Sequence, residues 1–211
     1  GGCGYLGAWL VPHLLVSGHT VTVVDTQWFG DGHLPDNGNL TVIKEDVREG
    51  RNAKEFDAVI WLASVSNNAM YEVNRELTRS VNTSMWYSHK PRFIYASSAA
   101  VMDPTSDYAM DKLYCEKLLR GTNAVIVRSA SVCGYSPNMR FDTTINRMVH
   151  DHHKNGVIKV NGGDQYRTHV SIKDICRFYQ HLCEMKDFPA GETFNVVSAN
   201  QTVRETAEMI G

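Results

Sequence analysis

Apolar and polar segments alternate along the 211-residue chain in a rhythm that is typical of alternating strands and helices. Segments rich in β-branched residues predict strands, and apolar residues repeated every three or four positions predict helices. The predicted strands are 19–25, 40–44, 56–63, 92–97, 123–128, 157–160 and 193–197. The predicted helices are 7–18, 74–87, 108–120, 143–154 and 172–185, with a further helix starting in the final segment ETAEMIG. This order favours a parallel sheet covered by helices.

Composition excludes several other classes of protein. Hydrophobic residues make up 43% and charged residues 21% of the chain, which is typical of a globular protein, and the net charge of −2 does not favour nucleic acid. The five cysteines are scattered without a CxxC pair, so a disulfide framework or a zinc site is not expected. No apolar run is long enough for a membrane span, and no signal peptide is expected. We therefore expect a cytoplasmic protein.

Glycines open the first predicted helix. Gly1, Gly4 and Gly7 form a GxxGxxG pattern there. Glycines let the backbone turn tightly and approach a pyrophosphate, while the free N–H groups of the helix N-terminus attract the phosphates. The pattern alone is weak evidence, because an ordinary glycine-rich turn looks the same.

Two acidic residues that follow strands strengthen this interpretation. Asp25 ends the next strand about 20 residues on, where an acid hydrogen-bonds the ribose hydroxyls of a dinucleotide and disfavours a ribose phosphate. NAD is therefore expected in preference to NADP. Asp25 as an ordinary turn residue is the alternative. Asp46 follows the predicted strand 40–44. Two interpretations of this residue are equally supported: a contact with the adenine of the cofactor, and the N-cap of a helix.

A tyrosine and a lysine provide candidate proton-transfer chemistry. Tyr108 and Lys112 are four residues apart on a predicted helix, so they share one face. A free phenol has a pKa of about 10, and a neighbouring ammonium lowers it. Ser97 and Ser98 end the strand 92–97, at the sheet edge where ligands bind in such folds. Taken alone, Tyr108 and Lys112 are explained as a solvated pair on a helix surface. Taken alone, a serine after a strand is explained as a turn residue.

These motifs together predict an α/β fold, a Rossmann-type doubly wound parallel sheet with a small, incomplete C-terminal substrate lobe. We expect residues 1–134 to form the NAD-binding domain. Residues 135–211 are expected to contribute to the substrate lobe and late sheet elements. A glycine turn normally follows a buried strand, and this sequence starts at the turn, so we expect a piece of a longer chain.

With these motifs in this order, the sequence resembles the extended short-chain dehydrogenase/reductase family. Within that family it is most similar to the group of NAD-dependent sugar epimerases and dehydratases. The resemblance covers nearly the whole chain. The segments that carry it are GGCGYLG, VTVVD, YASSAAV, YAMDK, RSASVCGYSP, GGDQYRTHVSIKD and FNVVS.

The resemblance implies a role for each matching residue. Ser98, Tyr108 and Lys112 would be catalytic, with Ser98 rather than Ser97 as the serine. Cofactor contacts would come from Gly1, Gly4, Tyr5, Leu6, Gly7, Asp25, Asp46, Val47, Leu62, Ala63, Asn82, Tyr108 and Lys112. Substrate contacts would come from Ser98, Ser131, Arg140 and Arg167. An exposed arginine at the start of a helix, without contact to the substrate, is an equally good interpretation of Arg140.

Several positions depart from the family pattern. Met102 and Asp103 follow Val101, where relatives usually have Tyr-Gly, and only ten positions separate Ser98 from Tyr108. Ser131 stands where many relatives have an asparagine. Ser98 is followed by two alanines instead of the Asp-Glu that marks 4,6-dehydratases, which disfavours that reaction.

The function expected from these residues is that of an NAD-dependent epimerase acting on a nucleotide-linked sugar. Tyr108 would remove a hydroxyl proton while hydride passes to NAD, giving a transient keto sugar. The alternatives are a nucleotide-sugar 4-ketoreductase or dehydratase, and a non-catalytic NAD sensor on the same fold. No metal is expected, because the histidines in 150–153 suit a helix end. The resemblance also suggests a homodimer, with no nucleic-acid or membrane partner.

Overall fold

The core of the protein is a parallel sheet with the strand order β3-β4-β5-β8. In this computed structural model, which describes residues 1–49, 56–66, 68–84 and 92–211, the four strands run over Val59–Trp61, Phe93–Ser98, Val125–Ser129 and Thr193–Val196. Side chains on the central strands are buried from both sides, which explains their continuous apolar character.

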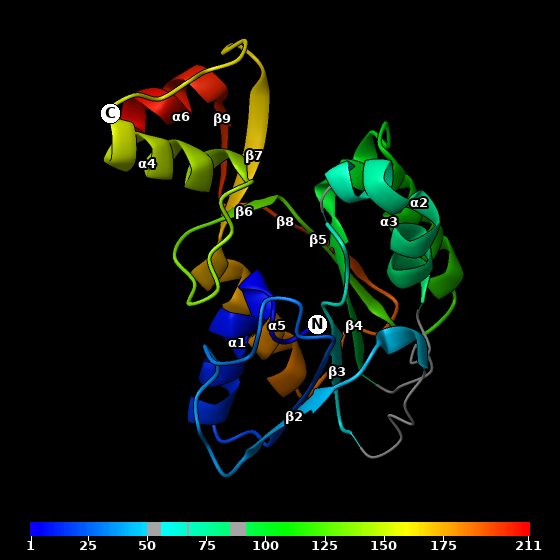
Figure 1. Cartoon of the computed structure of the whole chain (residues 1–211). Helices are drawn as coiled ribbons and strands as arrows, with labels where there is room; N and C mark the ends of the chain where they lie inside the picture. The colour runs from blue at the N-terminus through cyan, green and yellow to red at the C-terminus, as the bar shows by residue number, and fades with distance from the viewer. Residues whose placement is uncertain (50–55, 67, 85–91) are drawn as a thin grey trace.

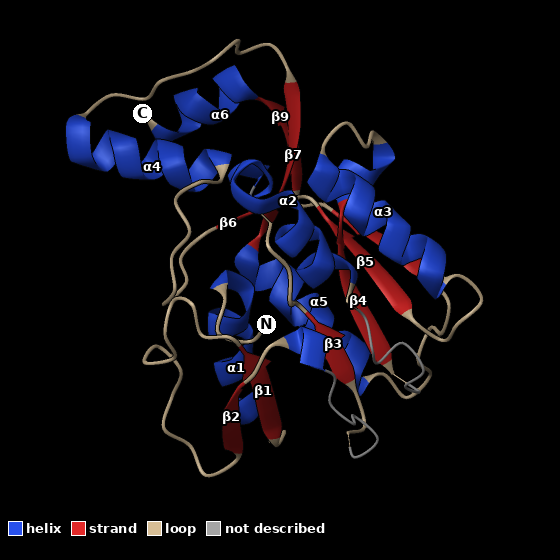
Figure 2. Cartoon of the chain, turned by 45° about the vertical axis from the view of Figure 1, so that its right-hand side comes forward, coloured by secondary structure: helices blue, strands red, loops and turns tan. Residues whose placement is uncertain are grey.

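Helices cover both faces of this sheet (Figure 2). On one face Ile94 packs with residues of α1 (Tyr5–Val16) and α5 (Ile172–Glu184). On the other face Phe93 and Tyr95 pack with α3 (Asp107–Leu119), which lies against α2 (Asn68–Thr83). Successive strand residues alternate between the faces, so each of them finds an apolar partner. The predicted doubly wound α/β architecture is confirmed.

A second parallel ladder joins β1 (Val21–Asp25) to β2 (Leu40–Lys44). Val23 packs there against the side of α1 opposite to the main sheet, and a short 3-10 helix η1 (Val47–Glu49) follows β2. A groove of about 1370 Å³ lies between β1 and β3.

A third sheet lies apart from the other two, beside α4 and α6 at the upper left of Figure 1. It contains β6 (Ser131–Cys133), β7 (Tyr166–Ser171) and β9 (Ala199–Thr202), with β7 and β9 antiparallel. The helices α4 (Thr144–Asn155) and α6 (Val203–Ile210) pack against each other. Thr202 and Glu205 form a capping box at the start of α6.

Most predicted elements are present with boundaries shifted by a few residues, and two differences are informative. The strand predicted at 157–160 is wrong, because Val157 follows the left-handed Gly156 at the end of α4, is exposed, and no described strand pairs with this segment. The helix predicted from Asn74 starts earlier, at Asn68. Its backbone kinks at Asn74, whose side chain accepts a hydrogen bond from the N–H of Leu77. Part of the prediction, residues 85–87, lies outside the described residues.

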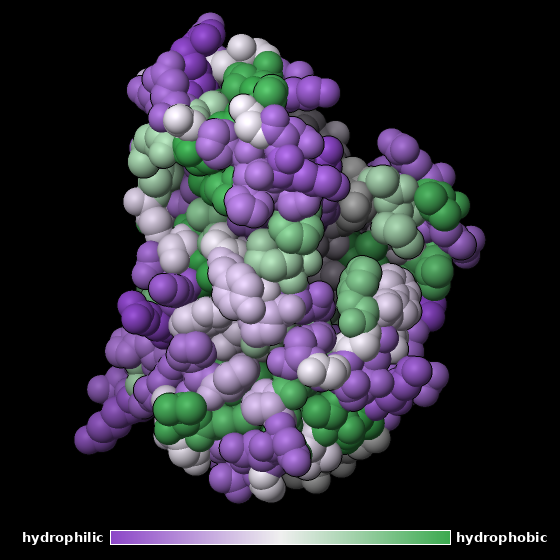
Figure 3. Space-filling view, turned by 60° about the vertical axis from the view of Figure 1, so that its left-hand side comes forward, coloured by the Kyte–Doolittle hydropathy of each residue, from purple (hydrophilic) through white to green (hydrophobic). Residues whose placement is uncertain are grey.

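Hydrophilic and hydrophobic residues are interspersed over the face of the protein drawn in Figure 3. Within the described ranges, no helix is both long enough and apolar enough to cross a membrane.

Candidate active site

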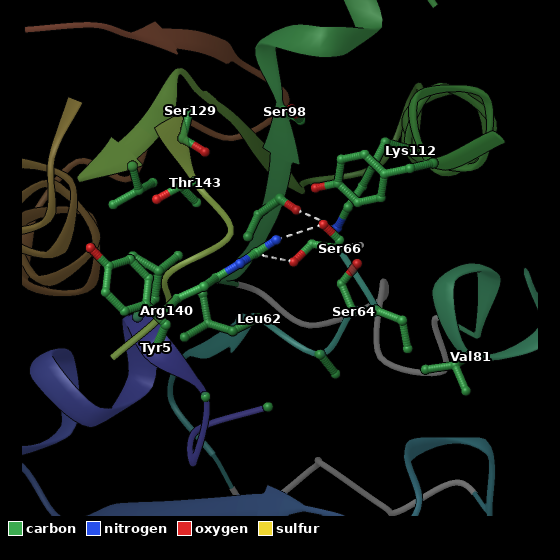
Figure 4. Close-up of a pocket in the computed structure, with 18 of the residues that line it drawn as sticks. Tyr5, Leu62, Ser64, Ser66, Val81, Ser98, Lys112, Ser129, Arg140 and Thr143 are labelled. Carbon is green, nitrogen blue, oxygen red and sulfur yellow. Dashed lines mark hydrogen bonds between the residues drawn. The ribbon is translucent and has the colours of Figure 1, made fainter. Parts of the chain in front are cut away.

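A cavity of about 460 Å³ lies where the carboxyl ends of β1, β3, β4 and β5 meet the first turn of α1 (Figure 4). Most of the residues predicted for cofactor and substrate line it, although they come from distant parts of the chain. They are Gly1, Gly4, Tyr5, Leu6, Asp25, Asp46, Val47, Leu62, Ala63, Ser98, Tyr108, Lys112, Ser131 and Arg140. The topology of the parallel sheet brings them together at one edge.

The glycine turn forms one end of the cavity. Gly4 is the N-cap of α1 and has no side chain to cap it, so the first N–H groups of the helix lack a capping side chain at the cavity. A methyl group on Gly4 would meet only the carbonyl of Gly1, at 3.7 Å. A methyl group on Gly7 would come within 2.2 Å of the carbonyl oxygen of Gly2. Gly7 does not line the cavity and instead lets the helix pack on the turn.

Asp25 connects this turn to the loop after β1. Its Oδ2 accepts a hydrogen bond of 3.0 Å from the N–H of Cys3, and its Oδ1 accepts one of 2.7 Å from the N–H of Gln27. Gln27 has a left-handed φ of 57°, and the aromatic side chains of Trp28 and Phe29 follow it along the cavity wall. Carboxylate oxygens have further lone pairs, so Asp25 can still accept hydrogen bonds from a ligand.

The position of Asp46 fits a helix start, and its contact with the adenine stays a prediction. The residue lines the cavity, and its Oδ1 accepts a hydrogen bond of 2.9 Å from the N–H of Arg48 at the start of η1. The Arg48 side chain also donates to both carboxylate oxygens, and these hydrogen bonds lower the pKa of Asp46.

Tyr108 and Lys112 lie on the first turns of α3, which begins after its N-cap Ser106. Lys112 is only 3% exposed and donates a hydrogen bond of 2.8 Å to the carbonyl of Ala96, with its Nζ 5.8 Å from the centre of the Tyr108 ring. Burial lowers the pKa of Lys112 to about 8. Lys112 is thus poised between its charged and neutral forms close to neutral pH.

The groups that favour the Tyr108 phenolate differ from the sequence-based expectation. Desolvation in the cavity raises the pKa of Tyr108, whereas the charge of Arg140 and a hydrogen bond with Ser98 lower it. The sequence assigned the lowering effect to Lys112. Arg140 lowers the pKa of Tyr108 because the fold places both residues in the same cavity. Their spacing along the chain does not reveal this contact.

The two neighbouring serines at the end of β4 have different partners. The hydroxyl of Ser97 is buried and donates to the carboxylate of Glu116 at 2.6 Å. Ser98 Oγ lies at the cavity and accepts a hydrogen bond from the N–H of Ala100, at the start of the 3-10 helix η3 (Ala99–Met102). Ser98 therefore has the position that the proposed chemistry needs.

Arg140 reaches across the cavity toward Ser66 (Figure 4). Its guanidinium donates to the hydroxyl of Ser66 and, at 2.8 Å, to the Ser66 carbonyl. Its other side is held by the carboxylate of Asp142, with N–O distances of 2.5 and 2.9 Å. Sequence reasoning missed Ser66 and Asp142, although Asp142 is only two residues from Arg140.

Two further predicted residues do not line the cavity. Asn82 is buried and supports a loop of its wall, because its Oδ1 accepts from the N–H of Val65 at 2.7 Å and its Nδ2 donates to the Val65 carbonyl. Its predicted contact with the cofactor stays a prediction. Arg167 is exposed on β7, so its contact with substrate phosphates stays a prediction.

Comparison with known proteins agrees with this arrangement. The family model described as "NAD dependent epimerase/dehydratase family" matches residues 1–197. Among solved structures, the UDP-N-acetylglucosamine 4-epimerase of Methanobrevibacter ruminantium M1, in complex with UDP-N-acetylmuramic acid, is 22% identical, with a TM-score of 0.82 over 99% of this chain and 78% of that chain. The UDP-glucuronic acid 4-epimerase of Bacillus cereus, in complex with NAD, is 20% identical, with a TM-score of 0.80 over 99% of this chain and 80% of that chain.

The enzyme WbmF of Bordetella bronchiseptica, in complex with NAD+, is 18% identical, with a TM-score of 0.82 over 99% of this chain and 75% of that chain. At these identities the structures show the Rossmann-type fold. The family model covers almost the whole sequence and carries the stronger conclusion. The chain belongs to the NAD-dependent epimerase/dehydratase family.

Proposed function

We propose that the protein is an NAD-dependent epimerase that acts on a nucleotide-linked sugar through a transient keto intermediate. The observation that carries this proposal is the shape of one cavity. The glycine turn and Asp25 form one end of it, and Ser98, Tyr108 and Lys112 form the other. A dinucleotide bound along this cavity would have its adenosine at the first end and its reactive ring at the second.

The residues present fit NAD. The uncapped start of α1 and the open space at Gly4 suit a pyrophosphate, and Asp25 suits two ribose hydroxyls. The carboxylate would repel the extra phosphate of NADP, since like charges meet there. Leu62 and Ala63 provide a wall under the cofactor, and Lys112 would reach the ribose next to the reactive ring.

The side chains at the far end suit proton transfer to and from a sugar hydroxyl. NAD, when bound, supplies the acceptor and donor of hydride. Tyr108, as the phenolate, takes the hydroxyl proton and later returns it to the carbonyl oxygen. Ser98 holds that oxygen by a hydrogen bond. The positive charge of Arg140 favours the phenolate over the neutral phenol, and Lys112 lies beside the ring.

The substrate class is inferred from relatives. Those of known structure include enzymes named for UDP-N-acetylglucosamine and UDP-glucuronic acid, and one was crystallised with UDP. In this chain, Arg140 and Ser131 line the cavity next to Ser98 and suit the phosphates or the sugar. Arg167 would have to be brought to the substrate from the third sheet.

Product mass tests this proposal against its alternatives. The purified protein is loaded with NAD and incubated with a panel of UDP- and dTDP-linked sugars. An epimerase gives a chromatographically distinct isomer of unchanged mass, and a dehydratase gives a product that has lost water. A ketoreductase, tested in a parallel reaction with NADH or NADPH and a keto sugar, gives a product that has gained two hydrogens. Tight NAD binding with no turnover of any sugar would favour the non-catalytic sensor.

The predicted homodimer also remains a proposal. Met110, Tyr114 and Leu118 are each about half exposed and are spaced by four residues, so they form an apolar stripe on the outer face of α3. Such a stripe suits contact with a second copy. Sedimentation of the wild type and of Leu118→Glu measures this, and an unchanged monomer in both would contradict it.

A further inference from the structure

Behind the cavity, a buried carboxylate and a guanidinium form a pair that the proposed chemistry does not use. Glu116 is 3% exposed, and its two oxygens accept hydrogen bonds of 2.9 and 2.6 Å from Nε and Nη2 of Arg128. Ser97 Oγ donates a third hydrogen bond of 2.6 Å to the same carboxylate. The pair therefore fastens α3 to the ends of β4 and β5.

This pair lies next to the lysine of the cavity. Glu116 is one helical turn after Lys112 on α3, so the two side chains share a face of the helix. Lys112 is equally buried, and its Nζ is fixed on the carbonyl of Ala96, one residue before Ser97. Glu116 thus contacts the same strand end as Lys112, one residue further along β4.

A buried ammonium needs negative charge nearby, because desolvation favours the neutral amine. Among the described residues, the titratable and charged groups around Lys112 come from α3, β4 and β5. They are Tyr108, Cys115 and Glu116 on α3, Tyr95 on β4 and Arg128 on β5. From α2, Arg79 and Tyr71 face Asp111. Cys115 and then Glu116 are the groups that raise the pKa of Lys112 against burial. Burial raises the pKa of the Cys115 thiol, so Glu116 is the one of the two that carries a negative charge at neutral pH.

We propose that Glu116 is a positioning residue that keeps Lys112 charged beside Tyr108, and that Arg128 limits this effect by neutralising part of the Glu116 charge. The consequence for catalysis rests on the proposed function. Loss of the Lys112 proton would remove a positive charge that lies 5.8 Å from the centre of the Tyr108 ring. The pH at which activity declines on the basic side would then follow the titration of Lys112.

The two halves of one ion pair should act in opposite directions. Glu116→Gln removes a negative charge and should lower the pKa of Lys112 by about one unit. Arg128→Met leaves Glu116 uncompensated and should raise it by a comparable amount. Both variants break the same bridge, so a merely structural role would shift the pKa in the same direction in both.

The test is a pH titration of isotope-labelled lysine by NMR in the otherwise intact protein, with the Lys112 signal assigned by its loss in Lys112→Met. No substrate is needed, so this result is independent of the reaction. Arg128→Lys, which keeps the charge but not the paired hydrogen bonds, is the matched control and should titrate close to the wild type. The double variant Glu116→Gln/Arg128→Met leaves no unpaired charge, and its Lys112 pKa should lie between those of the single variants.

Each single variant differs from the double variant by one charge, so one folded single variant is enough for the comparison. Shifts of opposite sign around the double variant support the proposal. Shifts of the same sign, or a Lys112 pKa that is equal in all variants, would overturn it.

Discussion

The two ends of the cavity are built in different ways. The glycine end presents backbone N–H groups, the open space at Gly4, and the aromatic residues Trp28 and Phe29, which are 55% and 78% exposed. The other end presents side chains, and buried hydrogen bonds such as those of Lys112 and Ser97 hold it in place. The first end is therefore sensitive to added volume, whereas the second is sensitive to changes of charge.

The largest effect should come from Tyr108→Phe, which removes the hydroxyl and little else. Turnover should fall by about 10²- to 10⁴-fold, because the proposed acid and base is lost. NAD affinity and thermal stability should stay close to the wild type, since the ring remains. Steady-state kinetics with the identified sugar and NAD titration measure these effects. Tyr166→Phe, at an exposed tyrosine on β7, is the control, and full activity of Tyr108→Phe would refute the role of Tyr108.

Two glycine substitutions separate folding from binding at the other end. Gly7→Ala should lower the free energy of unfolding by about 1–3 kcal/mol or more, because its methyl group would overlap the Gly2 carbonyl. Gly4→Ala should leave stability nearly unchanged and weaken NAD binding at least about tenfold, since its methyl group would fill space at the helix start. Thermal melts and NAD titrations measure both. Equal NAD affinity in Gly4→Ala and the wild type would mean that the pyrophosphate does not bind there.

The buried ammonium should also appear in the pH dependence of stability. The pKa of Lys112 is about 8 in the folded protein, below its ordinary value, so the folded state releases this proton at lower pH than the unfolded state does. The contribution of Lys112 to stability therefore increases as the pH rises above about 8. Relative to Lys112→Met, the wild type should gain about 3 kcal/mol of unfolding free energy between neutral pH and a pH of about 10.5. Denaturant titrations at several pH values check this, and a constant difference would contradict the low pKa.

The smallest effect concerns the choice of cofactor. Asp25→Asn keeps the size of the side chain and removes its charge, so the preference for NAD over NADP should fall by about tenfold. Asp36→Asn, at an exposed acid in the loop between β1 and β2, is the matched control. Competition binding of the two dinucleotides measures the preference. An unchanged preference in Asp25→Asn would show that Asp25 does not face the ribose.

The local parts of this account could be predicted from the sequence. Strand β4 and helix α3 were predicted within about one residue, because an apolar run and a helical spacing are local signals. The spacing of Tyr108 and Lys112 is a local signal too, whereas the choice of Ser98 over Ser97 depends on the family resemblance. Strands β6, β7 and β9 were missed because they are short and largely polar, and the fold alone pairs them.

The contacts that tune the site could not be predicted. Arg140 meets Ser66 from 74 positions away, and Asn82 supports Val65 from 17 positions away. The pair of Glu116 and Arg128 joins a helix to a strand that the sequence does not show as neighbours. Such contacts depend on how the elements pack, and single-residue patterns contain no signal for them. The boundary expected at residue 134 likewise stays a prediction.

The most direct test of the central claim is an incubation in deuterated water. The NAD-loaded protein is given an accepted nucleotide sugar, and the isomeric product is returned to ordinary water before its mass is measured. If Tyr108 moves only the hydroxyl proton and the hydrogen on the sugar carbon leaves and returns with the bound cofactor, the product will have unchanged mass. An isomer that carries one extra deuterium would show that the carbon-bound hydrogen exchanges with solvent, and would contradict the proposed roles of Tyr108 and NAD.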